Sequence, residues 1–234
     1  MEIILLEPKK QENLGAVARA MKNFDFSKLV LINPKCKTGI KARKVAKHAN
    51  DVLDKTKIKR ISYLKKFDYL IGTTAKLGTD YNIPRNAIDI EKLAIKLKTI
   101  INNKSKKNKI KIGLLIGREG IGLKNNEIDL CDILVTIPAS KKYPTLNISH
   151  SVSIILYELF KSNKEKSNSH INFATKKEKG VISKYLNKIL NKLDFQTKEK
   201  KDTQKIIWKR IFGKAMLTKR EAFAVMGFLR KLIK

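Results

Sequence analysis

The polar residues best suited to chemistry in this chain gather in three short segments, the first of which follows an apolar run at Ile3–Leu6. This segment, Asn13–Phe24, places an amide at Asn13 and a guanidinium at Arg19, six residues further along a predicted helix. Arg19 falls off the apolar face of that helix, so its side chain can reach either a ligand or solvent. Asn13 can equally cap the start of the helix. Taken alone, the segment leaves both alternatives open.

The second segment is rich in glycine. Gly117, Gly120 and Gly122 fall within six residues, directly after the apolar run Ile112–Ile116. The backbone here must turn sharply and lie close to another group. Glu119 is the carboxylate of this loop. The spacing matches neither common nucleotide-binding fingerprint, so a tight turn is the alternative interpretation.

The third segment joins an apolar run that ends at Ile137 to a predicted helix that extends to Phe160. Pro138 and Pro144 stiffen the connection between them, because proline fixes one backbone dihedral. Asn147 offers an amide at the start of the helix, where capping is again the alternative role.

The elements that must position these segments follow from the hydrophobic pattern. Up to about Lys161, short apolar runs suited to buried parallel strands alternate with helical stretches, which favours an α/β domain with a parallel sheet. Each polar segment follows a predicted strand, and ligands bind at the carboxyl ends of strands in such sheets. The predicted strands are Ile3–Leu6, Leu29–Ile32, Tyr69–Ile71, Ile112–Ile116 and Ile133–Ile137. The predicted helices include one with Leu14, Val17, Ala18 and Met21 on one face, and those at Glu91–Ile101 and Asn147–Phe160.

The rest of the chain has a different composition. Residues 162–180 are polar and predict a linker after a domain at residues 1–161. Residues 181–234 predict amphipathic helices, one of them preceded by a capping box at Thr218–Glu221. From Ser162 onward, 20 Lys and Arg residues stand against 6 Asp and Glu residues, a net charge of +14 out of +31 for the whole chain. Such a field favours a polyanion as partner, nucleic acid first and an anionic membrane second.

Other functions are disfavoured. No apolar run approaches the roughly 18–20 residues of a membrane-spanning helix, so no membrane partner is expected. Residues 1–7 lack the features of a signal peptide. The 3 histidines have no metal-ligand spacing, so no metal is expected. Cys36 and Cys131 lie far apart and predict free thiols in a cytoplasmic protein.

Together, the three segments resemble the three signature motifs of the SpoU-type RNA 2′-O-ribose methyltransferases of the SPOUT superfamily, in both order and spacing. The matching strings are NLGAVARAMKNF, LLIGREGIGL and VTIPASKKYPTLNISHSVSIILYE. The resemblance covers about residues 2–161. It implies a SPOUT fold, a parallel sheet whose C-terminal part forms a deep trefoil knot. Composition and periodicity give no hint of a knot, which is a rare topology.

The resemblance also implies a cofactor and a site. The cofactor is S-adenosyl-L-methionine, bound by the knotted loops at a homodimer interface, and Arg19 is the key catalytic residue. A guanidinium has a pKa above about 12 and no lone pair, so a nearby RNA phosphate is the better proton acceptor, with Arg19 orienting it. The residues implied to shape the catalytic site are Asn13, Glu119, Asn147 and Thr145. The residues implied to bind the cofactor are Thr73, Thr74, Ala75, Gly117, Ile137, Pro144, Thr145 and Leu146.

Residues 181–234, the tail of the chain, carry a resemblance of their own. The string RIFGKAMLTKREAFAVMGFLRKLI is similar to the C-terminal extension of the branch that methylates cytidine or uridine at nucleotide 32 of the tRNA anticodon loop. It implies 2′-O-methylation of tRNA, with residues 181–234 binding the tRNA. Two alternatives remain open: an rRNA ribose methyltransferase of the same fold, and a non-catalytic RNA-binding factor. The polar residues of the three motifs are intact, which argues against the second alternative.

Overall fold

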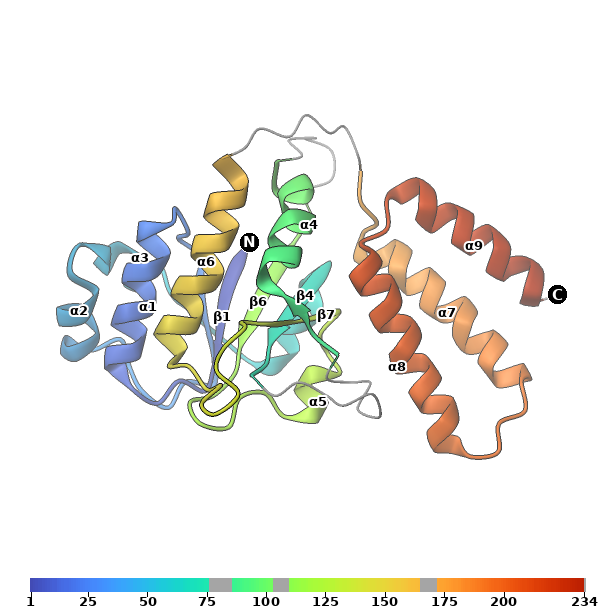
Figure 1. The fold of residues 1–234 in the computed structure, drawn as a ribbon, viewed down its shortest axis with the longest axis horizontal. Helices are drawn as coiled ribbons and strands as arrows, with labels where there is room; N and C mark the ends of the chain where they lie inside the picture. The colour runs from blue at the N-terminus through green and yellow to red at the C-terminus, as the bar shows by residue number, and fades with distance from the viewer. Residues whose placement is uncertain (76–85, 103–109, 165–171, 234) are drawn as a thin grey trace.

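The computed structural model describes residues 1–75, 86–102, 110–164 and 172–233. A seven-stranded sheet forms its centre, and every pair of neighbouring strands is parallel (Figure 1). The strand order is β3-β2-β1-β6-β4-β7-β5. The predicted α/β class with a parallel sheet is therefore confirmed. The strands are β1 (Glu2–Leu6), β2 (Leu29–Ile32), β3 (Lys57–Lys59), β4 (Tyr69–Thr73), β5 (Ile88–Asp89), β6 (Ile112–Ile116) and β7 (Ile133–Thr136).

The five predicted strands correspond to β1, β2, β4, β6 and β7. The sequence does not predict β3 or β5, the two edge strands. All three residues of β3 are exposed, and β5 has only two residues. Neither strand has a buried apolar run, so periodicity cannot detect them.

Apolar layers cover both faces of the sheet. Ile3 and Leu5 of β1 pack into one core cluster, whereas Ile4 and Leu6 pack into the other, as the two-residue period of a strand requires. Side chains of α1 (Gln11–Asn23), α3 (Asn50–Asp54), α4 (Ile90–Asn102) and α6 (Ile148–Lys164) join the first cluster. The second cluster is closed by the 3-10 helix η2 (Ile61–Lys66) and by α5 (Asn125–Ile128). The three predicted helices are confirmed as α1, α4 and α6.

Helix α1 also packs closely against α2 (Ile40–Ala46), which is followed by the 3-10 helix η1 (Lys47–Ala49). Gly15 lies at this contact. A Cβ atom on Gly15 would lie 2.1 Å from the carbonyl oxygen of Ala42. Glycine at position 15 therefore permits the close approach of another helix backbone.

Three helices form the tail: α7 (Lys176–Lys192), α8 (Lys198–Ala215) and α9 (Lys219–Ile233). They share a small core of their own, to which Ile182, Leu186, Ala222 and Leu229 contribute. The predicted capping box is present, because the Glu221 carboxylate accepts from the Thr218 N–H at 2.7 Å and the Thr218 hydroxyl accepts from the Glu221 N–H at 3.2 Å.

The tail packs against the amino ends of the central strands (Figure 1). Lys179 of α7 forms an ion pair of 3.1 Å with Asp132, which directly precedes β7. In α8, a Cβ atom on Gly213 would lie 2.2 Å from the carbonyl oxygen of Asp132, and Arg210 donates to the carbonyl of Ile128 at 2.9 Å. The three polar segments follow the carboxyl ends of the strands, whereas the tail contacts Asp68 and Asp132 at the amino ends of β4 and β7.

The bounds of the predicted linker fall partly on helices. Helix α6 continues to Lys164, and α7 begins at Lys176, while residues 165–171 lie outside the described part of the chain. The division into a domain at 1–161, a linker at 162–180 and a domain at 181–234 stays a prediction. Both cysteines are free thiols. No helix in the described ranges has the length and apolar character needed to span a membrane.

We expect Gly15→Ala to destabilise the protein, because its methyl group would meet a backbone carbonyl that cannot rotate away. Overpacked cores lose about 1–3 kcal/mol, and a rigid neighbour favours the upper end of that range. Gly227 in α9 provides the matched control, since a Cβ atom there meets nothing within 4 Å. Gly227→Ala should gain about 0.5–1 kcal/mol from helix propensity. Urea unfolding of both variants measures the difference, and equal stabilities would contradict the close contact of α1 with α2.

Candidate functional site

A cavity of about 410 Å³ opens at the carboxyl ends of β6, β4 and β7, three strands that lie side by side. All eight residues predicted to bind the cofactor line it: Thr73, Thr74, Ala75, Gly117, Ile137, Pro144, Thr145 and Leu146. Asn13, Glu119 and Asn147, which are predicted to shape the catalytic site, also line it. The structure thus brings together segments that are more than a hundred residues apart in sequence.

A chain of hydrogen bonds joins the three motifs at this cavity. The Asn147 side-chain amide donates to the Oδ1 atom of Asn13 at 3.2 Å. The Asn13 amide in turn donates to Glu119 Oε1 at 3.1 Å, and Glu119 Oε2 accepts from the Lys9 N–H at 3.1 Å. Asn13, at the centre of the chain of bonds, is only 8 % exposed, whereas Asn147 at one end is exposed. The polar residues of the motifs therefore fix one another's positions.

Helix capping, the alternative role predicted for Asn13 and Asn147, is absent at the first and present at the second. Helix α1 begins at Gln11, so Asn13 lies within its first turn, and its side chain bonds to the other motifs instead of capping α1. Asn147 does both, because its Oδ1 atom accepts from the Ser149 N–H at 2.8 Å while its amide donates to Asn13.

The glycine-rich loop closes on itself. The Arg118 N–H donates to the Gly122 carbonyl at 3.2 Å, and the Gly122 N–H donates back to the Arg118 carbonyl at 3.0 Å. Gly120 and Gly122 have φ values of 79° and 72°, which favour glycine. A Cβ atom on Gly117 would lie 2.3 Å from the carbonyl carbon of Gly122. The neighbour that requires glycine at position 117 is thus the far side of the same loop.

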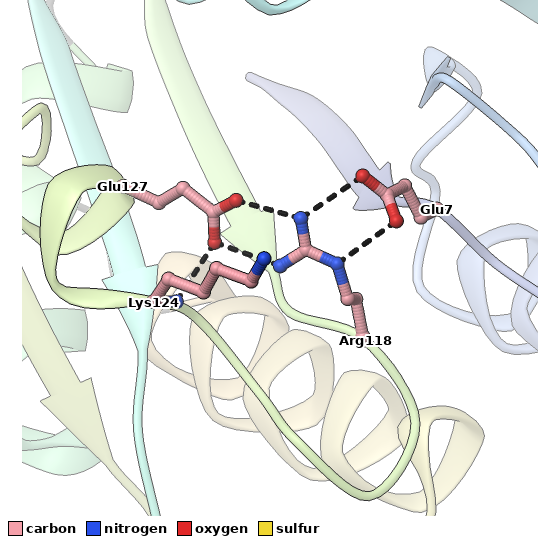
Figure 2. A network of polar contacts seen from close by, with 4 residues as sticks. All are labelled: Glu7, Arg118, Lys124 and Glu127. Carbon is pink, nitrogen blue, oxygen red and sulfur yellow. Dashed lines mark hydrogen bonds and ion pairs between the residues drawn. The ribbon is translucent and has the colours of Figure 1, made fainter.

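Arg118 is a buried residue of this loop for which the sequence predicts no role. Its guanidinium makes four hydrogen bonds, two to Glu7 at 3.0 Å each and two to Glu127 at 2.9 and 2.7 Å (Figure 2). Glu7 follows β1, and Glu127 lies in α5, where it also accepts from the Lys124 N–H at 2.8 Å. No local sequence pattern pairs residues 7 and 118, so only the fold reveals this contact.

Arg19 stands apart from the other predicted residues. Its side chain is exposed on α1, and it does not belong to the described lining of the cavity. This agrees with its predicted position off the apolar face. The structure of one chain therefore assembles the site without its predicted key catalytic residue. In the described part of the chain, no group of three or more His, Cys, Asp or Glu residues could hold a metal ion.

Comparison with known proteins identifies the family. The model of the SpoU rRNA Methylase family matches residues 1–157, which hold the first two motifs and all but the last residue of the third. The chain belongs to the SpoU methylase family. The matched range holds Asn13, Glu119 and Asn147, which line the described cavity.

Relatives extend this similarity over the tail. The tRNA (cytidine-2′-O-)-methyltransferase TrmJ of Methanocaldococcus jannaschii is 35% identical over 97% of each chain. The protein of the same name from Sulfolobus acidocaldarius is 29% identical over 99% of this chain and 93% of its own. The crystal structure of TrmJ from Z. mobilis ZM4 has a TM-score of 0.67 at 23% identity, covering 100% of this chain and 99% of that one. The similarity to these relatives thus extends over the helical tail.

The charged residues around Arg118 have perturbed pKa values. The hydrogen bonds from Arg118 hold the pKa of the Glu7 carboxyl below its ordinary value. Burial of Glu127 opposes its ionisation, but the Arg118 guanidinium outweighs burial and lowers the pKa of that carboxyl as well. Both carboxylates therefore keep their charge in the native state at pH values where a free glutamate is protonated.

This linkage predicts acid sensitivity. Because the native pKa values of Glu7 and Glu127 lie below the ordinary value of 4.5, the unfolded state takes up protons first as the pH falls. Their stabilisation is complete above about pH 4.5 and is lost as the pH falls through the lowered values. We expect Glu127→Gln to be less stable at pH 7 and to show a shallower loss of stability in acid. Urea unfolding between pH 7 and pH 3 tests this, with Glu91→Gln, an exposed carboxylate of α4, as the control. Identical pH slopes in wild type and Glu127→Gln would contradict it.

Proposed function

We propose that the chain is an S-adenosyl-L-methionine-dependent methyltransferase that transfers a methyl group to the 2′-hydroxyl of a cytidine in tRNA. The observation that carries the proposal is the similarity to two archaeal tRNA (cytidine-2′-O-)-methyltransferases over almost the whole chain, tail included. The rRNA alternative shares the motifs but gives no reason for similarity to tRNA enzymes in the helical tail.

The cavity fits the cofactor in size and chemistry. Its volume of about 410 Å³ lies within the range of small-molecule sites. Ile116, Leu123, Ile137 and Leu146 give it apolar walls suited to a planar base, and the polar residues Thr73, Thr74 and Thr145 line it as well. The SpoU methyltransferase AviRb from Streptomyces viridochromogenes, which has the same fold at a TM-score of 0.55, was solved in complex with AdoMet. When bound, this cofactor supplies the methyl group from its sulfonium.

The polar residues of the cavity orient the substrate. Asn13, Glu119 and Asn147 form a fixed hydrogen-bonded set at the cavity wall, which can hold a ribose in one orientation. The reacting hydroxyl must lose its proton as its oxygen bonds to the methyl carbon. The amides cannot accept that proton, and the Glu119 carboxylate already accepts hydrogen bonds from the Asn13 amide and the Lys9 N–H. We therefore assign acceptance of the proton to a phosphate of the RNA.

We further propose that the enzyme acts as a homodimer with the knotted SPOUT topology. Arg19 does not line the described cavity of its own chain, so the partner's Arg19 is the one that reaches the RNA at this cavity. Its guanidinium would orient the phosphate and stabilise charge that develops on the hydroxyl oxygen. We propose nucleotide 32 of the anticodon loop as the target and the cytoplasm as the location.

The reaction is tested by incubating unmodified tRNA with the protein and S-adenosylmethionine that carries a labelled methyl group. Mass spectrometry of the nucleosides should show labelled 2′-O-methylcytidine, and digestion into fragments should place it at nucleotide 32. An rRNA fragment serves as the competing substrate. Label in rRNA alone would overturn the assignment to tRNA, and cofactor binding without any label would support the non-catalytic RNA-binding factor.

The role of Arg19 is tested with mixed dimers. Arg19→Ala should cost about 3–4 kcal/mol in the activation barrier, the loss typical of a donor to developing charge, with little change in stability because the side chain is exposed. In a dimer of one Arg19→Ala subunit and one Gly117→Val subunit, an arginine supplied by the partner leaves one complete site. About half of the wild-type activity should therefore return. A mixed dimer as inactive as its parents would show that Arg19 serves its own chain.

We also propose that the tail supplies affinity for tRNA. Lys177, Lys184 and Lys188 lie on one exposed face of α7, opposite its buried residues. Replacing all three with glutamine should weaken tRNA binding. It should also flatten the dependence of log Kd on log salt, by about one unit for each RNA phosphate that the variant no longer neutralises.

The matched control replaces three exposed lysines with glutamine and so removes the same charge. These are Lys44 in α2, Lys55 after α3 and Lys57 in the edge strand β3. Cofactor affinity should stay unchanged in both variants. If both triple variants have the same salt slope, net charge rather than the tail accounts for the binding.

A further inference from the structure

We propose that Arg118 is a positioning residue, whose ion pairs with Glu7 and Glu127 hold the Gly117–Leu123 loop in the shape that binds the cofactor. The inference rests on the proposed function, because it takes the cavity as the cofactor site. It concerns a residue that touches the cavity wall but that neither the motif pattern nor its local sequence singles out.

The guanidinium joins three separate parts of the chain. Four of its five N–H groups are used, two on Glu7 after β1 and two on Glu127 in α5 (Figure 2). Such paired hydrogen bonds fix the plane of a guanidinium as well as its position. The side chain of Arg118 is only 8 % exposed, so water does not replace these contacts.

The backbone of the same residue controls the loop. Arg118 pairs with Gly122 through two hydrogen bonds, which bring the ends of the turn together. Gly117 comes directly before it and Glu119 directly after it, and both line the cavity. Any rotation of the Arg118 backbone would therefore move the Glu119 carboxylate away from Asn13 and change the cavity wall.

Stability alone does not require the ion pairs of Arg118 with Glu7 and Glu127. Buried ion pairs cost desolvation, and apolar residues of similar volume often stabilise a fold equally well or better. Glu7 also has a φ of 45°, an uncommon conformation for a residue other than glycine. Backbone strain and buried charge in one network are expected where a site needs fixed geometry. What this network provides, and an apolar cluster cannot, is orientation.

The test separates positioning from stability with two variants. Arg118→Lys keeps the charge but loses the planar set of donors. The triple variant Glu7→Gln, Arg118→Met, Glu127→Gln removes every charge of the network, so that no buried charge is left without a partner. Thermal melts report stability, and calorimetry reports the Kd for S-adenosylmethionine. Steady-state methylation gives KM for the cofactor, KM for tRNA and kcat.

We expect the triple variant to melt near the wild-type temperature while its Kd for the cofactor rises about tenfold, which is the effect of misaligning one or two hydrogen bonds. KM for the cofactor should rise with it, and KM for tRNA should not. Arg118→Lys should show the same rise in Kd. If the triple variant has both the melting temperature and the cofactor Kd of the wild type, Arg118 is a structural residue only, and the proposal fails.

The ion pair of Lys179 with Asp132 supplies the matched control. Its partners are 13 % and 17 % exposed, comparable to the network of Arg118, but they lie at the amino edge of the sheet, away from the cavity. Lys179→Met with Asp132→Asn should change the melting temperature without changing the cofactor Kd. A similar loss of affinity in this control would also overturn the proposal, because general loosening would then explain it. Wild-type protein that does not bind the cofactor would instead refute the proposed function.

Discussion

The site depends on one constraint of parallel sheets: strands that lie side by side place their carboxyl ends at the same edge. Because β6, β4 and β7 are neighbours, the segments that follow them must meet, although their order in space differs from their order along the chain. Strand β1 lies beside β6, so the helix that follows β1 brings Asn13 to the same place. The cavity is therefore a consequence of strand order, and the loops only shape its walls.

Within that frame, the residue types follow from hydrogen-bond chemistry. Asn13 accepts a bond from Asn147 and donates one to Glu119, two opposite roles that a single amide can fill. An aspartate in its place would set a second carboxylate against Glu119, and an alanine would remove the bond that Asn13 makes to each neighbour. Arg118 meets a different need, since two carboxylates that approach one loop from opposite sides require a planar donor with several N–H groups.

The sequence predicts these features unequally, for physical reasons. Central strands such as β1 and β6 are recognisable because both of their faces are buried, and the polar segments after them are recognisable because strand ends are where ligands bind. Arg118 has no such signal, because Glu7 is 111 residues away in the chain and its approach depends on the pairing of β1 with β6. The packing of Gly213 against Asp132 is equally invisible, since glycine in a helix marks a close contact only when the neighbour is known.

The distribution of charge separates two tasks. At the cavity, Arg118 is neutralised by Glu7 and Glu127, while Glu119 is held by an amide and a backbone N–H, so charge there serves to fix positions. From Ser162 onward the chain carries a net +14, and its helices α7 and α8 contact Asp68 and Asp132 at the amino ends of β4 and β7. In the proposed function, lysines on exposed helix faces need no fixed geometry to attract phosphates. Attraction to a polyanion acts over a distance and tolerates mobile side chains, whereas alignment of a single hydroxyl does not. An enzyme that must both capture a large RNA and align one ribose is therefore best served by keeping these two kinds of charge apart.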